Sequence, residues 1–490
     1  MNSTKPVYRA KALIFASLLL IVIHSCQKDV DEIPYDEPQF AIETGNSDMP
    51  YLVVETKGLG ILNEPKIPAD LTLYVQKVEI QRTLIGIEFR GSTSYRLSDK
   101  KSYGIETWDS EGNDTDVAFF DFPEEEDFIL MGHIVNLENK FVFDRTLIYN
   151  YFGYEIFSKM GRYASRTELV ELEINGEYKG VYVFMEKLKR DKNRIDIKKL
   201  EPTDTDSTAI TGGYILKIDK TAGGDLNLDE PLEYFEDNWE DDALYTSDIS
   251  FRSKYDIYGN LIDFAPFDGP YHSKQYLETY FLYDYPKSDE ITEMQKSYIQ
   301  SYIHDFETAL LTDDFSSDLR TYTNYIDLES FVDFFVINEI CRNVDGYRLS
   351  TYMYKDRGEK LKMGPVWDLN IGFFSGDRVP MDDWVINYNN FVSQDPWMMP
   401  FWWPRLMEDP LFTEMLKDRW NNLRFNILSL AELNRMVDMA AGNLRNNGAA
   451  DRNYSHWDQQ IGIDWESSIE ELKSYLEERV LWMDSEISAL

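Results

Sequence analysis

The sequence predicts an α+β fold, with a β-rich first part and a mainly helical second part. Three observations support this fold class. Between residues 51 and 107, apolar residues alternate with polar ones or run together, as they do in half-buried and buried strands. Two further strand-like runs at 168–174 and 178–184 flank Asn175-Gly176, which is a strong hairpin signal. From residue 289 onward, helical patterns dominate.

The elements follow in order along the chain. Strands are predicted at 71–75, 85–89 and 102–107, and a helix is predicted at 143–160, where Gly161 ends it. After the hairpin, residues 200–285 are irregular, acidic and aromatic, with one strand-like stretch at 213–219. We interpret this segment as an insertion or a lid.

The second part is expected to be built around a buried helix. Helices are predicted at 289–311 and 328–341, and the second is apolar nearly all round, so it should be buried. Two short strands follow at 351–354 and 361–367. Capping boxes at Ser429–Glu432 and Ser467–Glu470 each predict the start of a further helix, in a C-terminal segment that spans 429–490.

The first 25 residues have the features of an export signal. Lys5, Arg9 and Lys11 precede an apolar stretch at 12–23, which is too short to cross a bilayer core. Ile23-His24-Ser25-Cys26 then resembles a lipobox, in which the cysteine is acylated after cleavage. An ordinary signal peptide with a coincidental cysteine is the alternative. Residues 26–48 are polar, acidic and punctuated by proline, so we expect a flexible tether there.

These features predict a lipoprotein of the cell envelope, held at the outer membrane through Cys26 alone. Several acyl chains on one cysteine are enough for stable anchoring. The acidic tract after the cysteine resembles the surface-export signal of some Gram-negative lipoproteins, which favours exposure on the cell surface.

Composition excludes several function classes. The net charge of −39 opposes binding to nucleic acid, so no nucleic-acid partner is expected. Cys26 and Cys341 are the only cysteines, and with Cys26 lipidated no intrachain disulfide can form. The five histidines do not have zinc-ligand spacing, and the sequence contains no G-x-S-x-G, Walker A or H-E-x-x-H motif.

Two aspartates stand in loops that the order of elements brings to one end of a small sheet. Asp345 follows the buried helix, and Asp368 follows the second short strand, 23 residues later. Phosphoryl transfer from a nucleotide needs such a pair, one carboxylate to align the acceptor hydroxyl and accept its proton, the other to hold Mg²⁺. In the alternative interpretation, Asp345 is a turn residue and Asp368 is a helix cap.

Upstream segments add features of a nucleotide site. The loop Arg90-Gly91-Ser92-Thr93-Ser94 can bring backbone N–H groups close to phosphate. Lys101 can reach the α- and β-phosphates, with Glu155 as its partner, although both side chains would also suit a solvated surface. The hairpin ends at Glu186, where a kinase-like fold has its interlobe hinge. Loop, lysine, helix, hairpin, hinge, buried helix and two aspartate loops follow in the order of a protein kinase.

Five segments in this order resemble the CotH kinase family, atypical kinases related to the bacterial spore coat protein H. The segments are Phe89-Arg-Gly-Ser-Thr-Ser94, Lys100-Lys-Ser-Tyr103, Glu173-Ile-Asn-Gly-Glu-Tyr-Lys-Gly-Val-Tyr182, Asn343-Val-Asp345 and Gly364-Pro-Val-Trp-Asp368. The resemblance covers roughly residues 49–425. It implies a two-lobed, atypical protein-kinase-like fold, with a β-rich N-lobe at 49–188 and a mainly helical C-lobe at 189–428. It also implies ATP with Mg²⁺ or Mn²⁺, and phosphate transfer to serine or threonine of secreted or envelope proteins.

The family's functional residues are carried over position by position. Asp345 matches the catalytic aspartate and Asp368 the metal-binding aspartate, while Lys101 matches the phosphate lysine. Where the family pattern has an asparagine as second metal ligand, this chain has Ser350, whose hydroxyl is the weaker ligand. Asp368 is followed by Leu369 and not by Phe-Gly, so the local turn differs from that of other kinases.

A second function class stays open on the sequence alone. ATP is scarce outside the cytoplasm, and a kinase-like scaffold can serve as a non-catalytic binder of an envelope protein or a glycan. Trp397, Trp402 and Trp403 would supply an aromatic platform for a sugar, unless they are core residues.

Overall fold

The structure, a computed structural model, describes residues 47–221, 239–373, 378–457 and 461–490. The signal peptide, Cys26 and nearly all of the tether lie outside the described residues and stay predictions. Among the helices described, none has the combination of length and apolar character that crossing a bilayer requires.

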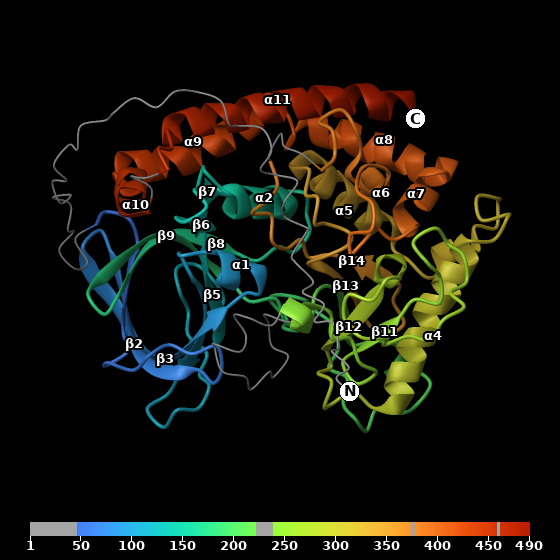
Figure 1. The fold of residues 1–490 in the computed structure, drawn as a ribbon, viewed down its shortest axis with the longest axis horizontal. Helices are drawn as coiled ribbons and strands as arrows, with labels where there is room; N and C mark the ends of the chain where they lie inside the picture. Colours follow the sequence, from blue (N-terminus) through green and yellow to red (C-terminus); the bar gives the residue numbers. More distant parts are fainter. Residues whose placement is uncertain (1–46, 222–238, 374–377, 458–460) are drawn as a thin grey trace, which may run out of the picture. The chain divides into compact units, whose positions relative to one another are not determined.

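The first part of the chain forms a closed seven-stranded barrel (Figure 1). Its strands are β1 (Tyr51–Glu55), β2 (Ile67–Val75), β3 (Val78–Arg90), β4 (Ser102–Trp108), β5 (Asp127–Gly132), β8 (Thr167–Ile174) and β9 (Glu177–Glu186). Around the barrel the order is β1-β2-β3-β4-β5-β9-β8. All neighbours pair antiparallel except β1 and β8, which pair in parallel and close the barrel. Alternate side chains such as Leu71, Leu73, Ile85 and Ile87 fill its interior, as the sequence pattern predicts.

A second sheet of five strands lies outside the barrel. Its members, in the order β11-β12-β10-β13-β14, are β11 (Ser250–Arg252), β12 (Tyr280–Tyr285), β10 (Tyr214–Ile218), β13 (Thr351–Lys355) and β14 (Leu361–Met363). Every pairing in it is antiparallel. A further two-stranded sheet joins β6 (Val135–Asn136) and β7 (Phe141–Val142).

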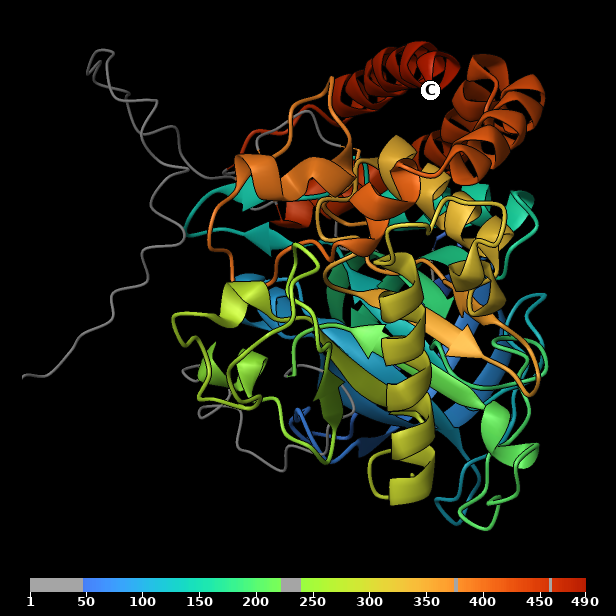
Figure 2. The ribbon, with the colours of Figure 1, turned by 90° about the vertical axis from the view of Figure 1, so that its right-hand side faces the viewer.

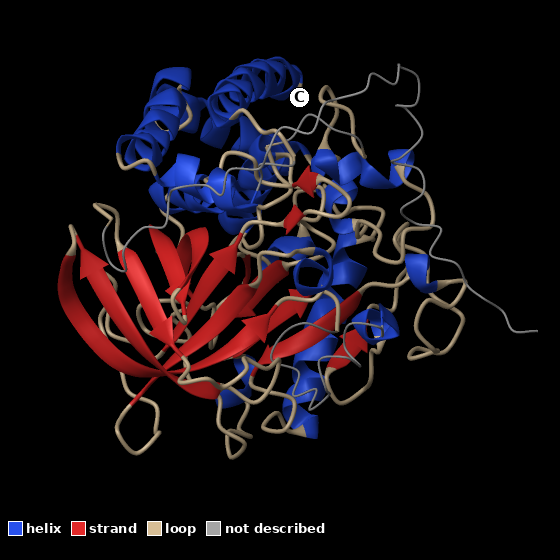
Figure 3. Ribbon diagram, turned by 60° about the vertical axis from the view of Figure 1, so that its left-hand side comes forward, coloured by secondary structure: helices blue, strands red, loops and turns tan. Residues whose placement is uncertain are grey.

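Helices cover this second sheet and continue to the C-terminus (Figures 2 and 3). The α-helices of the described residues are α1 (Thr93–Leu97), α2 (Tyr149–Lys159), α4 (Glu293–Leu310), α5 (Leu328–Cys341), α6 (Tyr388–Phe391), α7 (Trp402–Met407), α8 (Pro410–Phe425), α9 (Leu430–Asn446), α10 (Ala449–Trp457) and α11 (Trp465–Ala489). Of these, α1 and α2 come between barrel strands in the chain, after β3 and before β8. Helix α5 is buried over nearly its whole length, as predicted. Tyr298 and Gln300 of α4 contact Tyr214 and Tyr283 of the sheet, so α4 packs directly on it.

The C-terminal helices contact both the barrel and the helical part. Asn453 of α10 accepts hydrogen bonds from Lys100 Nζ (2.8 Å) and from the backbone N–H of Val181 in β9 (3.0 Å). A Cβ on Gly180 would lie 2.4 Å from Asn453 Oδ1, so glycine is needed for this close approach. Further along the chain, α11 packs on α5 through a buried ion pair between Arg479 and Glu339. The last helices therefore tie the barrel to the core helix.

Three sequence predictions are corrected by the structure. Residues 200–285 contain more than the one predicted strand at 213–219, which is β10, because they also supply β11 and β12 of the second sheet. The helix predicted from 143 begins at Tyr149, since Asp144 instead accepts hydrogen bonds from the backbone N–H groups of the turn before it. Helix α11 begins at Trp465, and its N-cap is Asp464, three residues before Ser467, the predicted N-cap.

The tryptophan cluster is mainly core. Trp402 and Trp403 are each 1% exposed, so they cannot form a sugar platform with Trp397. The indole N–H of Trp402 donates to Glu307 of α4 (3.0 Å), which places a carboxyl group inside the core.

We predict that Glu307 makes stability fall as pH rises. Burial raises the pKa of this carboxyl to about 8, although Ser253 and Trp402 donate hydrogen bonds to it. Glutamate in an unfolded chain titrates near ~4.3, so between about pH 5 and pH 8 the folded state retains a proton that the unfolded state has lost. Stability should therefore fall by up to about 1.4 kcal/mol per pH unit from this group, and Glu307→Gln should flatten that slope.

Urea unfolding at a series of pH values measures this slope. The matched control is Glu414→Gln, at an exposed position of α8, which should leave the slope as it is in the wild type. A Glu307→Gln variant with the wild-type slope would contradict the prediction.

Candidate active site

Asp345 lies in the loop that follows α5. Its Oδ1 accepts a hydrogen bond from Arg348 (2.6 Å), and Arg378 lies 3.5 Å from the same oxygen. The side chain is 30% exposed, so a ligand can reach it. Burial acts to raise the pKa of this carboxyl, yet the positive charges of Arg348, Arg378 and Lys220 outweigh it and hold the pKa below its usual value. Asp345 is therefore ionised at neutral pH.

Buried side chains of α5 shape this loop. Asn338 accepts a hydrogen bond from the Asn343 side chain (3.2 Å), and its carbonyl accepts from the Asn343 N–H (3.0 Å). A Cβ on Gly346 would lie 2.3 Å from Asn338 Oδ1, so only glycine fits next to Asp345. Glu339 accepts from the hydroxyl of Tyr347 (3.2 Å). The apolar helix thus carries the few polar groups that position the loop.

Asp368 follows β14 in a strained turn. Its φ of +54° lies in the left-handed region, and its backbone N–H donates to the hydroxyl of Tyr154 (3.1 Å) on α2. Asn150 of α2 accepts from the next N–H, that of Leu369 (2.7 Å). Burial raises the pKa of Asp368 to about 7, and the negative charges of Asp345 and Asp219 add to the rise. These two aspartates are therefore its electrostatic neighbours.

Asp219 is a carboxylate of the site that the sequence did not single out. It follows β10 and accepts hydrogen bonds from the backbone N–H groups of Lys220 (2.9 Å) and Ser350. Burial raises its pKa. Ser350, predicted as a metal ligand, thus contacts the site through its main chain, in a left-handed conformation with φ of +47°. A strand ending in Ile-Asp-Lys was the only local signal for Asp219.

The predicted phosphate loop borders the same site. Gly91 has φ of +99°, a conformation that favours glycine and turns the chain into α1, which contains Ser94. The Arg90 guanidinium lies over the ring of Trp367, 5.2 Å from its centroid, and its charge lowers the pKa of Asp368. Ser92 donates a hydrogen bond to Asp242 (2.6 Å).

The predicted Lys101–Glu155 pair is not present. Lys101 Nζ donates to the carbonyl of Tyr95 (2.6 Å) and lies 4.3 Å from the centroid of that ring. Glu155 instead pairs with Lys159 one helical turn further along α2 (3.0 Å), where its side chain is 45% exposed. Glu155 is therefore a partly exposed residue that pairs within α2, and its role in the nucleotide site stays a prediction.

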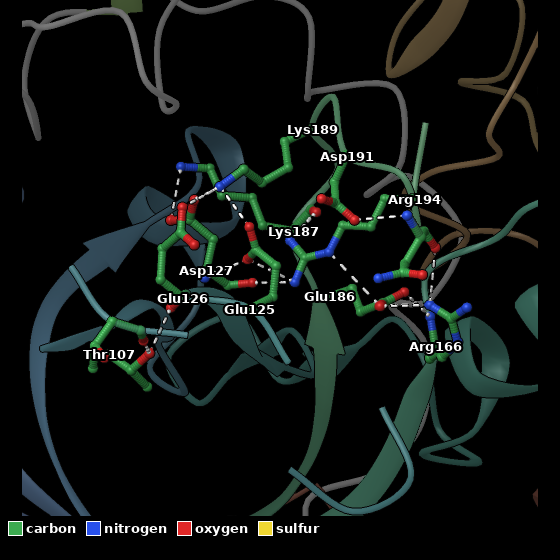
Figure 4. Close-up of polar contacts among 12 residues, drawn as sticks. Thr107, Glu125, Glu126, Asp127, Arg166, Glu186, Lys187, Lys189, Asp191 and Arg194 are labelled. Carbon is green, nitrogen blue, oxygen red and sulfur yellow. Dashed lines mark hydrogen bonds and ion pairs between the residues drawn. The ribbon is translucent and has the colours of Figure 1, made fainter. Parts of the chain in front are cut away.

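Glu186, predicted at the nucleotide hinge, belongs to a buried ionic network (Figure 4). Its carboxylate accepts hydrogen bonds from the Arg166 side chain (2.7 Å), the Arg166 backbone N–H (2.9 Å) and the Tyr163 hydroxyl (3.1 Å). Arg194 lies 3.7 Å away. The Glu186 carboxylate is therefore engaged within the protein.

The same network contains a group of acids with metal-like spacing. Among the described residues, Glu125, Glu126 and Asp127 form the one such group of three, with ligand atoms within 4.8 Å of one another. The ammonium of Lys189 lies 2.5 to 2.8 Å from all three carboxylates (Figure 4). Lys189 thus takes the place of a cation, and the group is structural.

The aspartate site has the donors that a hard divalent cation prefers. Carboxylate oxygens suit Mg²⁺ and Mn²⁺, and Asp368 Oδ1 is a buried atom without a hydrogen-bond partner in the described chain. The three aspartates are not gathered as closely as the group around Lys189. Mg²⁺ commonly uses one or two carboxylates together with phosphate and water, so this wider arrangement fits a cation that arrives with a nucleotide.

The structure is thus an α+β fold in which two aspartate loops, arginines and a glycine-containing loop border one region. The family described as "CotH kinase protein" matches residues 87–483, which is well over half of the chain. The chain belongs to this family. A search of curated proteins gives no match.

Proposed function

We propose that this protein is an atypical extracytoplasmic kinase of the CotH type. It would transfer the γ-phosphate of ATP to serine or threonine hydroxyls of a secreted or envelope protein. The observation that carries the proposal is the proximity of the two aspartate loops: the Phe373 N–H, after Asp368, donates to the Cys341 carbonyl at the end of α5, before Asp345, and the charge of Asp345 raises the pKa of Asp368. In the two-lobed arrangement that we propose, the barrel is the N-lobe, and the second sheet with its helices is the C-lobe.

Asp345 is the catalytic residue in this proposal. Its ionised, partly exposed carboxylate aligns the acceptor hydroxyl. A bond forms between the hydroxyl oxygen and the γ-phosphorus, the bond from that phosphorus to the β–γ bridging oxygen breaks, and ADP leaves while the proton passes to Asp345. A lowered pKa is compatible with this role, because phosphoryl transfer depends mainly on positioning and electrostatics.

Asp368 would hold the divalent cation, with Asp219 and Ser350 beside it. A bound Mg²⁺ or Mn²⁺ supplies charge neutralisation to the phosphates. Burial and two neighbouring carboxylates disfavour the ionised form of Asp368, and Arg90 and Lys220 offset this only in part, so a bound cation would relieve the remaining repulsion. Arg90 adds a positive charge on the side of the phosphate loop.

The location is part of the proposal. The basic and apolar start of the chain and the lipobox ending in Cys26 support an anchored envelope protein, exposed to the outside. Metabolic labelling with a radioactive fatty acid tests it, and label on a Cys26→Ser variant would refute it.

Label transfer from γ-³²P-ATP tests the activity. The mature chain, incubated with Mg²⁺ or Mn²⁺ and a generic serine-containing protein, is expected to label that protein or itself, and a chelator should abolish the labelling. A wild-type chain that neither binds ATP nor transfers label would refute the kinase proposal.

A non-catalytic binding role is the second candidate. The observation that favours it is the engagement of Asp345 by Arg348 and Arg378, which lowers its basicity. ATP binding without label transfer would support this candidate.

A further inference from the structure

Lys220 lies between the phosphate loop and the loop of Asp345. Its ammonium donates to the hydroxyl of Thr93 in α1 (2.7 Å) and to Asp242 Oδ2 (3.0 Å). It also lies over the ring of Trp397, 5.0 Å from the centroid. The backbone of Lys220 continues from β10 and bonds to Asp219, so the side chain starts within the aspartate site.

Asp242 brings this lysine and the loop together. It lies in a short helical turn (Trp239–Ala243) and is 0% exposed. Besides Lys220, its carboxylate accepts hydrogen bonds from Ser92 (2.6 Å) and Arg96 (2.7 Å). Lys220 and Arg96 thus both contact one carboxylate beside the hydroxyls of the loop. A phosphate held at this loop would meet the Lys220 ammonium, and a lysine binds phosphate as a point charge.

A second chain of contacts leads from Lys220 to Asp345. The carbonyl of Trp397, whose ring lies under the Lys220 ammonium, accepts a hydrogen bond from Arg348 (2.7 Å). Arg348 in turn donates to Asp345 (2.6 Å). The charge of Lys220 accordingly lowers the pKa of both Asp345 and Asp368. Lysine, loop and aspartates therefore belong to one region.

We propose that Lys220, and not Lys101, is the lysine that binds the nucleotide phosphates, and that Asp242 positions it. This inference rests on the proposed function and assigns the phosphate-binding side of the same site. In this proposal, Lys220 is the phosphate-binding lysine and Asp242 its carboxylate partner, the roles that the sequence analysis gave to Lys101 and Glu155. The side chains of Lys101 and Glu155 contact other residues.

Nucleotide titrations of the mature chain test the assignment. In the presence of Mg²⁺ or Mn²⁺, Lys220→Met is expected to weaken ATP binding about 10-fold or more and to leave adenosine binding unchanged, because it removes a charge-assisted contact to phosphate. Lys220→Arg keeps the charge and should stay within about threefold of the wild type. The matched control, Lys101→Met, should also stay within about threefold.

A double-mutant cycle tests the positioning role of Asp242. Asp242→Asn should weaken ATP binding in the wild type but add no further loss in the Lys220→Met background. A purely structural effect of Asp242 would instead lower affinity equally in both backgrounds, and the melting temperature of each variant shows whether the fold is retained.

The outcomes distinguish the assignment of Lys220 from the proposal of kinase activity. Unchanged ATP affinity in Lys220→Met, or an equal loss in Lys101→Met, overturns the assignment of the lysine while the kinase proposal stands. A wild-type chain that binds no nucleotide overturns the kinase proposal and this inference with it.

Discussion

An Asp345→Asn variant is expected to transfer phosphate at least about 10²-fold more slowly than the wild type, with ATP affinity within about threefold. The amide keeps the size of the carboxylate but cannot accept the proton of the acceptor hydroxyl, and it loses the charge that orients that hydroxyl. Asp345 faces the acceptor in the proposed mechanism, so the loss should appear in kcat. Steady-state label transfer at saturating ATP, together with an ATP titration, separates the two quantities.

Asp395 offers a matched control. Its Oδ1 lies 3.3 Å from Arg348, the same arginine that donates to Asp345, yet the mechanism gives it no contact with substrate. Its carboxylate also accepts hydrogen bonds from the Tyr388 hydroxyl (2.9 Å) and the Trp397 N–H (2.9 Å). Asp395→Asn therefore reports what a change in the surroundings of Arg348 does while Asp345 is intact, and we expect a loss below about fivefold. Equal losses in both variants would show that Asp345 acts only through the arginine, against its assignment as the catalytic residue.

An Arg479→Ala variant is expected to lose about 3 to 5 kcal/mol of unfolding free energy. Arg479 and Glu339 are both 0% exposed, and the guanidinium donates to the Glu339 carboxylate (2.9 Å) and to its carbonyl (2.8 Å). It also donates to the carbonyls of Met381 and Asp383. Truncation removes the positive charge that pairs with a buried carboxylate and the donor to three carbonyls, and leaving one partner of a buried pair in place is costly.

Urea unfolding of Arg445→Ala gives the comparison. Arg445 and Glu466 form a bidentate pair with both bonds at 2.6 Å, but their side chains are 43% and 56% exposed. Solvent screens this pair, and its loss should cost less than about 1 kcal/mol. If Arg479→Ala were no more destabilising than Arg445→Ala, burial of the Arg479–Glu339 pair would not explain its contribution to the free energy of unfolding.

Local patterns were sufficient for much of the fold. The apolar run at 328–341 is the buried helix α5, because a helix that is apolar all round has no face for water. Asn175-Gly176 forms the predicted hairpin with both residues at positive φ. The closure of the barrel was not predictable in this way, since β1 pairs in parallel with β8, more than a hundred residues away.

In the candidate site, too, local sequence patterns could be interpreted, whereas features that depend on long-range pairing could not. Asp345 and Asp368 could be proposed from the sequence because each follows a recognisable element and their spacing suits one chemistry. The proposed roles of Asp219 and Lys220 depend on the pairing of β10 with β13, which brings the Ser350 N–H to Asp219, so the sequence alone did not suggest them. The proposal of Lys220 over Lys101 as the phosphate-binding lysine depends on the position of Asp242. This residue lies in a segment whose sequence has no regular pattern.

The junction made by Asn453 and Arg479 has a consequence for the order of events in biogenesis. Both residues belong to the last part of the chain to be synthesised, whereas their partners on β9 and α5 emerge much earlier. If the chain is exported N-terminus first, as we propose, it would lack these contacts until its final helices had crossed the membrane. In the export that we propose, this late completion would leave the chain incompletely folded until its final helices had crossed.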